Sequence, residues 1–403
     1  PYTTLFRSMP ATFQTVEPDG ADASAPPPPA RLIWSASETC ADLLYLSGFP
    51  APDAFLWFRT PDETAIVVSA LEVGRARKQA SEGVRVYAWS DLRDRLGLPE
   101  TARLEPGTVV PRLAEHIGIR RWGVPEAFPL GVGRKLEAAG LDLTVVDPFV
   151  PERARKREDE VDRIREGVRL AEAGLAAALQ RLRNARIGPD GILVETDGEP
   201  LTAEALRGEI AARIARLGGT ASHTIAAPGP QSSDPHCTGT GPIRSGEPVI
   251  IDIFPRVDRS GYHGDLTRTV VKGTAPDRVR KAFDAVRAAR EEAIQTIGPG
   301  TPAADVHRTA ADRLQAAGFP TDKGADPPTG FFHGLGHGLG LEVHEAPRVS
   351  GTSDARLEAG HVVTVEPGVY YPEWGGIRLE DVVVVTESGC ENLTVAPTFL
   401  ELE

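Results

Sequence analysis

The sequence has few cysteines, no long apolar run and no excess of basic residues. Its 403 residues include three cysteines, Cys40, Cys237 and Cys390, whose wide separation excludes a disulfide framework and zinc-finger spacing and indicates a reducing compartment. No stretch contains the roughly 18 apolar residues of a membrane helix. The net charge of -13 argues against nucleic acid or an anionic membrane as a partner, because both attract clustered Lys and Arg. We therefore expect a cytoplasmic globular protein.

Methionine is also scarce. The single methionine, Met9, is the expected start of the natural chain, and the residues before it (PYTTLFRS) resemble the translation of a sequencing-adapter oligonucleotide. Residues 10–30 are polar, end in consecutive prolines, and lack the basic start and apolar core of a signal peptide. We expect residues 1–30 to form a disordered leader, of which 1–8 are foreign.

Residues 31–150 carry the pattern of a small α/β domain. Helical periodicity at 37–46 is followed by strand patterns at 64–71 and 84–88. No His, Asp, Glu or Cys in this half has the spacing of a ligand cluster, so we interpret it as a packing or substrate-capping domain. A shift to proline and basic residues near 148–156 marks its end.

Residues 151–403 repeat one pattern twice. Two amphipathic helices precede a strand-rich stretch, and two further helices precede a second one. The helices are expected at 158–183, 202–217, 277–297 and 302–317. This order indicates an internal pseudo-duplication, and a site shared by the two halves would draw ligands from both. The whole chain therefore has the pattern of an α+β protein.

Two aspartates stand in strand-rich sequence where burial is costly without a cation. Asp252 interrupts the apolar run 249–254, and a buried charge needs a cation or a dense set of donors. Asp265 opens the β-rich run 266–271, and turn residues lie between the two aspartates. A hairpin would put both aspartates on one face, where a metal would resolve their repulsion.

A glycine-rich segment at 332–344 holds three of the nine histidines, His333, His337 and His344. Glycine allows close backbone approach and positive φ at an entropic cost. One isolated histidine is more often a packing residue, but three in such a frame favour a functional site.

Two glutamates complete the pattern. Glu366 follows the β-branched run 362–365, and Glu380 precedes the apolar run 382–385. Any one of these carboxylates could be a solvated strand end. Four carboxylates on apolar strands, together with the histidine segment, indicate a metal site.

A catalytic Cys–His pair is the alternative at His236 and Cys237. Adjacent residues of an extended segment point in opposite directions, which disfavours a direct pairing of these two side chains.

Together these motifs resemble the pita-bread metallopeptidases, which include Xaa-Pro aminopeptidases, Xaa-Pro dipeptidases (prolidases) and methionine aminopeptidases. The ligand order Asp–Asp–His–Glu–Glu and its context carry the resemblance over residues 151–403. Residues 31–150 resemble, more weakly, the creatinase-like N-terminal domain of the proline-directed members. The resemblance implies an α+β pita-bread catalytic domain with a smaller α/β N-terminal domain. It also implies a dinuclear-metal exopeptidase that hydrolyses the Xaa-Pro bond with metal-activated water.

The resemblance also assigns roles to single residues. It implies that Asp252 binds one metal, that His337 and Glu366 bind the second, and that Asp265 and Glu380 bridge both. It implies that His236, His333 and His344 bind substrate. His236, His344 and Glu366 would be catalytic, with Glu366 as general base. Arg378 would orient Asp252.

Two loop lengths depart from the family. The two aspartates are thirteen residues apart where about eleven is usual, and an insertion of two keeps side-chain parity in a hairpin. We therefore expect the site to survive with a longer turn at its rim. The link from Glu366 to Glu380 is short, which implies a trimmed loop and altered substrate access.

The oxygen-rich ligand set favours two divalent ions, manganese first and cobalt, iron or zinc as alternatives. The expected partner is a proline-containing peptide, and we expect a homodimer. Methionine aminopeptidases generally lack the N-terminal domain, which disfavours that activity. Creatinase and inactive pita-bread peptide-binding proteins lack the full ligand set present here. The choice between dipeptidase and aminopeptidase stays open.

Overall fold

The computed structural model describes residues 29–403, and the expected leader at 1–28 lies outside the described residues. The chain divides into two compact units, the first ending at Phe149 and the second running Val150–Glu403. The described part begins its first strand at Ala30, one residue before the expected domain boundary. Within residues 29–403 no helix combines the length and the apolar composition needed to cross a membrane.

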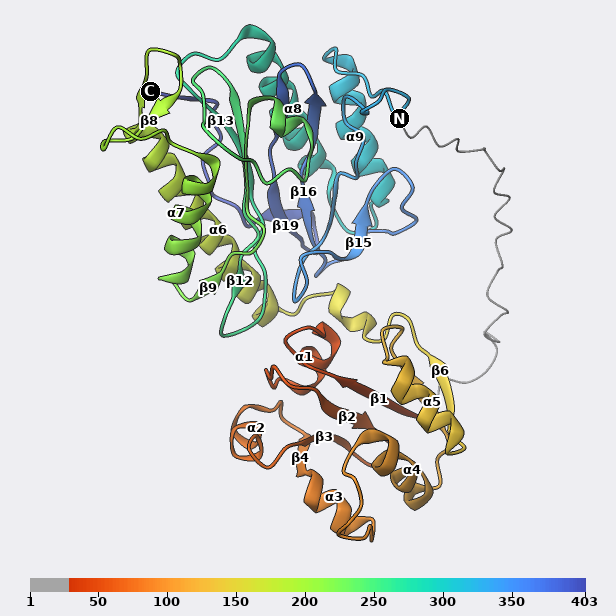
Figure 1. Ribbon diagram of the computed structural model, residues 1–403. Helices are drawn as coiled ribbons and strands as arrows, with labels where there is room; N and C mark the ends of the chain where they lie inside the picture. Colours follow the sequence, from red (N-terminus) through yellow and green to blue (C-terminus); the bar gives the residue numbers. More distant parts are fainter. Residues whose placement is uncertain (1–28) are drawn as a thin grey trace, which may run out of the picture. The chain divides into compact units, whose positions relative to one another are not determined.

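The first unit is an α/β domain built on one mixed sheet (Figure 1). The strands run in the order β4-β3-β2-β1-β5-β6, in which β1–β2 and β2–β3 are antiparallel and the other pairs are parallel. Their bounds are β1 Ala30–Ser35, β2 Phe55–Arg59, β3 Thr64–Val68, β4 Val84–Ala88, β5 Arg121–Val124 and β6 Asp142–Val145. The helices are α1 Ala41–Ser47, α2 Val73–Gln79, α3 Trp89–Arg95, α4 Pro106–Ile117 and α5 Leu130–Ala138.

Helix α1 begins later than its periodicity predicts. The buried Ser37 hydroxyl donates to the Phe49 carbonyl and accepts the Ala51 N–H, each at 2.7 Å. These bonds hold residue 37 in a loop, because a serine side chain that bonds distant backbone competes with the helix.

The second unit repeats two helices and a sheet, as expected. Helices α6 Glu158–Asn184 and α7 Ala203–Ala215 pack on the sheet β10-β11-β13-β21. Helices α8 Asp277–Thr296 and α9 Ala303–Ala316 pack on the sheet β15-β14-β16-β19-β20. Figure 1 shows each helix pair in its own colour range, green and teal to light blue.

The strands of the second unit are short. In chain order they are β7 Arg186–Ile187, β8 Leu193–Val194, β9 Gly219–Thr220, β10 Ile225–Pro228, β11 Pro248–Asp252, β12 Arg256–Val257, β13 Thr267–Lys272, β14 Gly336–Gly338, β15 Glu345–Val349, β16 Val362–Val365, β17 Gly368–Tyr371, β18 Gly375–Arg378, β19 Asp381–Val385, β20 Cys390–Asn392 and β21 Glu401–Leu402. The pairs β7–β8, β9–β12 and β17–β18 form separate two-stranded sheets. Two 3-10 turns, Pro151–Ala154 and Gly229–Ser233, complete the unit.

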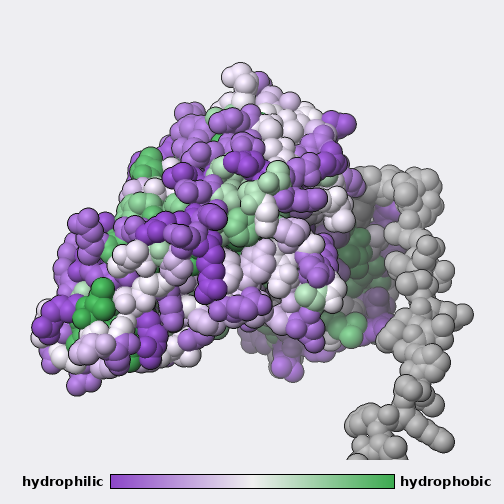
Figure 2. All heavy atoms as spheres, turned by 90° about the horizontal axis from the view of Figure 1, so that it is seen from above, coloured by the Kyte–Doolittle hydropathy of each residue, from purple (hydrophilic) through white to green (hydrophobic). Residues whose placement is uncertain are grey.

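Figure 2 draws one face of the molecule, on which hydrophilic side chains predominate and hydrophobic ones form small separate groups. Buried polar groups, by contrast, are concentrated in the second unit, among them Asp252, Asp265, His337 and Glu380.

Candidate metal centre

The two aspartates lie at the facing ends of two antiparallel strands, with Asp252 at the end of β11 and Asp265 two residues before β13. Asp252 is the last residue of β11 and lies opposite Thr267 of β13 in antiparallel register. The Ile253 N–H donates to the Leu266 carbonyl at 3.0 Å, which extends the pairing toward Asp265. Asp252 ends its strand rather than interrupting it, so its carboxylate lies at the strand terminus.

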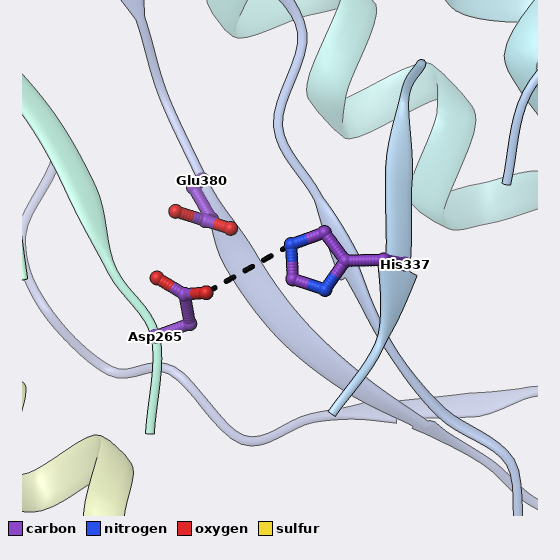
Figure 3. A group of neighbouring side chains, drawn as sticks. All are labelled: Asp265, His337 and Glu380. Carbon is purple, nitrogen blue, oxygen red and sulfur yellow. Dashed lines mark ion pairs between the residues drawn. The ribbon is translucent and has the colours of Figure 1, made fainter. Parts of the chain in front are cut away.

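Three of the predicted ligands converge on one point. Atoms of Asp265, His337 and Glu380 that could ligate a metal all lie within 4.8 Å of one another, and all three residues are buried. Figure 3 shows the three side chains pointing toward one another from three separate segments. Asp265 precedes β13, His337 lies in β14, and Glu380 precedes β19. The convergence therefore joins both halves of the second unit.

The imidazole of His337 is held in the form that binds metals. Its Nδ1 lies 3.0 Å from the Gly338 carbonyl, a contact in which the ring must donate. Nε2 then presents its lone pair at 3.9 Å from Asp265 Oδ2 and 3.5 Å from Glu366 Oε1. Burial lowers the pKa of His337 to about 4, so the ring is neutral at neutral pH.

The carboxylates repel one another in this buried space. Burial, followed by the charge of Glu380, raises the pKa of both Asp265 and Glu366 well above the usual range. Burial and the charge of Asp252 likewise raise the pKa of Glu380 to about 8. Divalent cations would remove this cost, because opposite charge stabilises the ionised forms.

Asp252 has one oxygen engaged and one available. Its Oδ2 accepts from Arg378 NH2 at 2.7 Å, whereas its buried Oδ1 has no hydrogen-bond partner among residues 29–403. A buried carboxylate oxygen without a donor is costly, and a bound cation would satisfy it. Asp265, His337 and Glu380 form the group of converging ligand atoms, which does not include the predicted ligands Asp252 and Glu366. Two carboxylates and a neutral imidazole in that group fit a divalent ion.

Two hydroxyl groups that the sequence reasoning missed support this set. Thr267 Oγ1 donates to Glu380 Oε2 at 2.8 Å, and the Glu380 N–H donates to the Thr267 carbonyl at 3.0 Å. The Tyr370 hydroxyl accepts from Arg378 NH1 at 3.0 Å and lies 2.9 Å from His333 Nε2. Thr267 follows Asp265 by two residues, a spacing that shares one strand face and could have indicated it. No local signal points to Tyr370.

The glycines beside His337 are needed because neighbouring backbone lies too close to leave room for a Cβ atom, not because they adopt positive φ. None of Gly334, Gly336, Gly338 and Gly340 is among the residues with positive φ. A Cβ added at Gly336 would lie 2.0 Å from the Thr364 carbonyl oxygen, and one at Gly338 would lie 2.2 Å from the Ala346 carbonyl oxygen. These glycines let β14 fit between β15 and β16, which corrects the part of the prediction that invoked positive φ.

The other three predicted histidines, His236, His333 and His344, differ in how deeply they are buried. His344 is exposed, and its ring packs edge-on against His337 with centroids 4.3 Å apart. His236 is exposed. Burial, followed by the charges of Arg348 and His236, lowers the pKa of His344. Burial, followed by the charge of Arg378, lowers the pKa of His333 to about 3. His333 is therefore a neutral, hydrogen-bonded residue.

Comparison with known proteins decides the family. A model of metallopeptidase family M24 matches residues 162–387, and a model of the creatinase/prolidase N-terminal domain matches residues 32–156. The chain belongs to metallopeptidase family M24. It is a metallopeptidase with the pita-bread catalytic fold and a creatinase-like N-terminal domain, as the sequence predicts, and the family implies divalent metals.

Related M24 proteins match over most of their length. An Xaa-Pro dipeptidase of Pyrococcus furiosus is 27% identical over 335 residues, which covers 83% of this chain and 85% of that protein. A probable dipeptidase PepE of Mycobacterium tuberculosis is 30% identical over 339 residues, with 83% and 81% covered. The crystal structure of X-Pro aminopeptidase from Thermotoga maritima superposes with a TM-score of 0.77 at 23% identity, with 93% and 97% covered, and shows the fold alone.

Proposed function

We propose that this protein is a dinuclear metal-dependent exopeptidase that cleaves the bond preceding proline in short peptides. The observation that carries the proposal is the convergence of Asp265, His337 and Glu380, whose ligand atoms lie within 4.8 Å of one another in a buried, acidic site. The names of the relatives, Xaa-Pro dipeptidase and X-Pro aminopeptidase, support the choice of bond.

The metals would be held by five side chains: Asp252, Asp265, His337, Glu366 and Glu380. When bound, two divalent ions supply an activated water and polarise the scissile carbonyl. Manganese is our proposal for both ions, because hard oxygen donors dominate the set. We also retain a homodimer and a cytoplasmic location as proposals.

The residues of the chain then perform proton transfer and orientation. Glu366 is the proposed general base, which would accept a proton and pass it to the leaving nitrogen. The rings of His236 and His344 would orient the peptide and stabilise the oxygen of the tetrahedral intermediate. Arg378 holds the carboxylate of Asp252 through a 2.7 Å ion pair and so fixes its free oxygen.

Three peptides test the proposal on the purified, manganese-loaded chain. Ala-Pro and Ala-Pro-Ala separate a dipeptidase, which must capture a free carboxylate, from an aminopeptidase with an open exit. Met-Ala-Ala tests the methionine aminopeptidase alternative. We expect turnover of at least one proline peptide and two metal ions per chain by elemental analysis.

Two substitutions test the proposed residues. Glu366→Gln keeps the size of the side chain but removes the carboxylate that would serve as base and as metal ligand, and Asp265→Ala removes a proposed bridging ligand. We expect turnover to fall by about 100-fold or more in either variant. Absence of bound metal, together with no turnover of any of the three peptides, would refute the proposal.

A further inference from the structure

A buried ion pair lies directly behind the loop that carries His344. Glu345 follows His344 and begins β15, where it pairs with Gly338 of β14. The Glu345 Oε2 atom accepts from Lys156 Nζ at 2.8 Å, and Oε1 accepts from Arg153. The side chain of Lys156 is 1% exposed and that of Glu345 is 5% exposed. This pair is thus formed almost out of contact with solvent.

The carboxylate of Glu345 organises the loop around itself. Its Oε1 accepts the Glu342 N–H at 3.1 Å, and the Gly340 N–H donates to the Glu342 carbonyl at 3.1 Å. A Cβ added at Gly340 would lie 2.7 Å from Glu345 Oε2, so the loop backbone closes tightly over the carboxylate. The shape of residues 340–344 therefore depends on Glu345 remaining inside.

Lys156 is itself fixed to the second unit by its backbone. The Lys156 N–H donates to the Gly360 carbonyl at 2.7 Å, and neighbouring Arg155 forms a β-bridge with His361. The lysine precedes α6, which begins at Glu158. Lys156 is therefore an anchored cation rather than a flexible surface side chain.

Burial acts with different results on the two partners. It would by itself raise the pKa of Glu345, but the charges of Lys156 and Arg153 outweigh burial and lower it. For Lys156, burial outweighs the charge of Glu345 and lowers the pKa of the lysine. Burying both charges costs more than an exposed pair would, and such pairs are weak evidence for stability alone. A role in positioning the loop accounts for the burial of this ion pair, because the loop closes over the Glu345 carboxylate.

We propose that Lys156, together with Arg153, is a positioning residue that holds the His344 loop in place through the carboxylate of Glu345. This inference rests on the proposed function only in assigning His344 to substrate. Without Lys156, Glu345 Oε2 loses its 2.8 Å donor and Arg153 alone holds the carboxylate through Oε1, so the carboxylate would shift toward solvent and carry residues 340–344 with it. His344 would then lose its edge-on contact with His337, and kcat would fall more than KM would change.

The test compares Lys156→Met with Lys272→Met in the full-length, manganese-loaded chain. Counted over the whole residue, both lysines are 7% exposed, but Lys272 Nζ donates to the Arg183 and Glu403 carbonyls, away from the loop. We expect Lys156→Met to reduce kcat by about tenfold or more with unchanged metal content. We also expect faster hydrogen exchange in a peptide covering residues 339–345. Lys272→Met should show neither change, even if its melting temperature falls equally.

A second variant and an activity-independent readout keep the test decisive. Glu345→Gln retains the side-chain size but removes its charge, so it serves if Lys156→Met does not fold. The proposal would be overturned if Glu345→Gln showed the hydrogen exchange and the kcat of the wild-type chain. It would also be overturned if the two lysine variants behaved identically in both measurements. If the wild-type chain cleaves no peptide while Lys156→Met still selectively loosens residues 339–345, the proposed function fails and the positioning role stands.

Discussion

Replacing Arg378 by methionine should weaken both the fold and the proposed chemistry. The guanidinium is 3% exposed and donates to Asp252 at 2.7 Å, to the Tyr370 hydroxyl at 3.0 Å and to the Pro235 carbonyl at 3.2 Å. Methionine fills much of the same volume but donates nothing. The buried carboxylate of Asp252 would then keep its charge but lose its hydrogen bond from Arg378, so that neither of its oxygens has a donor from that residue.

The expected magnitude follows from breaking a buried ion pair. Removing one partner of such a pair costs about 3–5 kcal/mol. For a domain of this size each kcal/mol lowers the melting temperature by roughly 2–4 °C, so we expect a decrease of about 10 °C in the metal-free protein. Manganese should reduce the difference in melting temperature between Arg378→Met and the wild-type chain, because the cation restores positive charge beside Asp252. Activity should fall by about 10–100-fold because Asp252 is no longer oriented.

Differential scanning fluorimetry in EDTA and in manganese, with peptide turnover measured in parallel, checks this expectation. Arg290→Met is the matched control: Arg290 NH1 lies 3.3 Å from Asp381 Oδ1, and Asp381 retains Arg268 at 2.9 Å after the change. The control should therefore lose less stability and keep its activity. Equal melting temperatures for the two variants, with wild-type turnover in Arg378→Met, would refute the reasoning.

Two further predictions concern the repulsion among the carboxylates. Because the folded metal-free protein holds protons on Asp265, Glu366 and Glu380 at raised pKa values, it binds more protons than the unfolded chain. Its melting temperature in EDTA should therefore fall as the pH rises from 5 to 8. With manganese bound, the decrease should be smaller. The same dependence of melting temperature on pH in EDTA and in manganese would contradict this prediction. Asp265→Asn replaces a carboxyl group that must take up a proton when the metal-free chain folds at neutral pH, so it should raise the metal-free melting temperature by a few degrees, at roughly 2–4 °C per kcal/mol relieved. The same variant should lose manganese binding in calorimetry, and unchanged affinity would rule out Asp265 as a ligand.

Strongly periodic segments were predictable from the sequence. The long helix expected at 158–183 is Glu158–Asn184, because its apolar positions repeat at the helical period over seven turns. The strand expected at 84–88 is β4. The hairpin of the two aspartates was also predictable, since turn residues separate two β-rich runs.

The supporting groups of the site were not predictable in the same way. The Tyr370 hydroxyl meets Arg378 and His333 through the pairing of β17 with β18, a tertiary arrangement that no local pattern encodes. Lys156 meets Glu345 across 189 residues of sequence. Such contacts depend on which strands become neighbours, and hydrophobic periodicity specifies the face of a strand but not its partner.

The segment between the two aspartates is held against helix α6 rather than forming a bare turn. Its residues form β12, which pairs with β9, and the Tyr262 hydroxyl donates to Glu160 Oε1 of α6 at 2.6 Å. Farther along, a Cβ at Gly264 would lie 2.0 Å from the Gly167 backbone, so the turn returns in direct contact with the same helix. The segment is therefore bound to α6 before the chain reaches Asp265. These contacts fix where the chain turns back toward β13, and the carboxylate of Asp265 faces His337 (Figure 3). The expectation that this turn is longer than in the family stays a prediction.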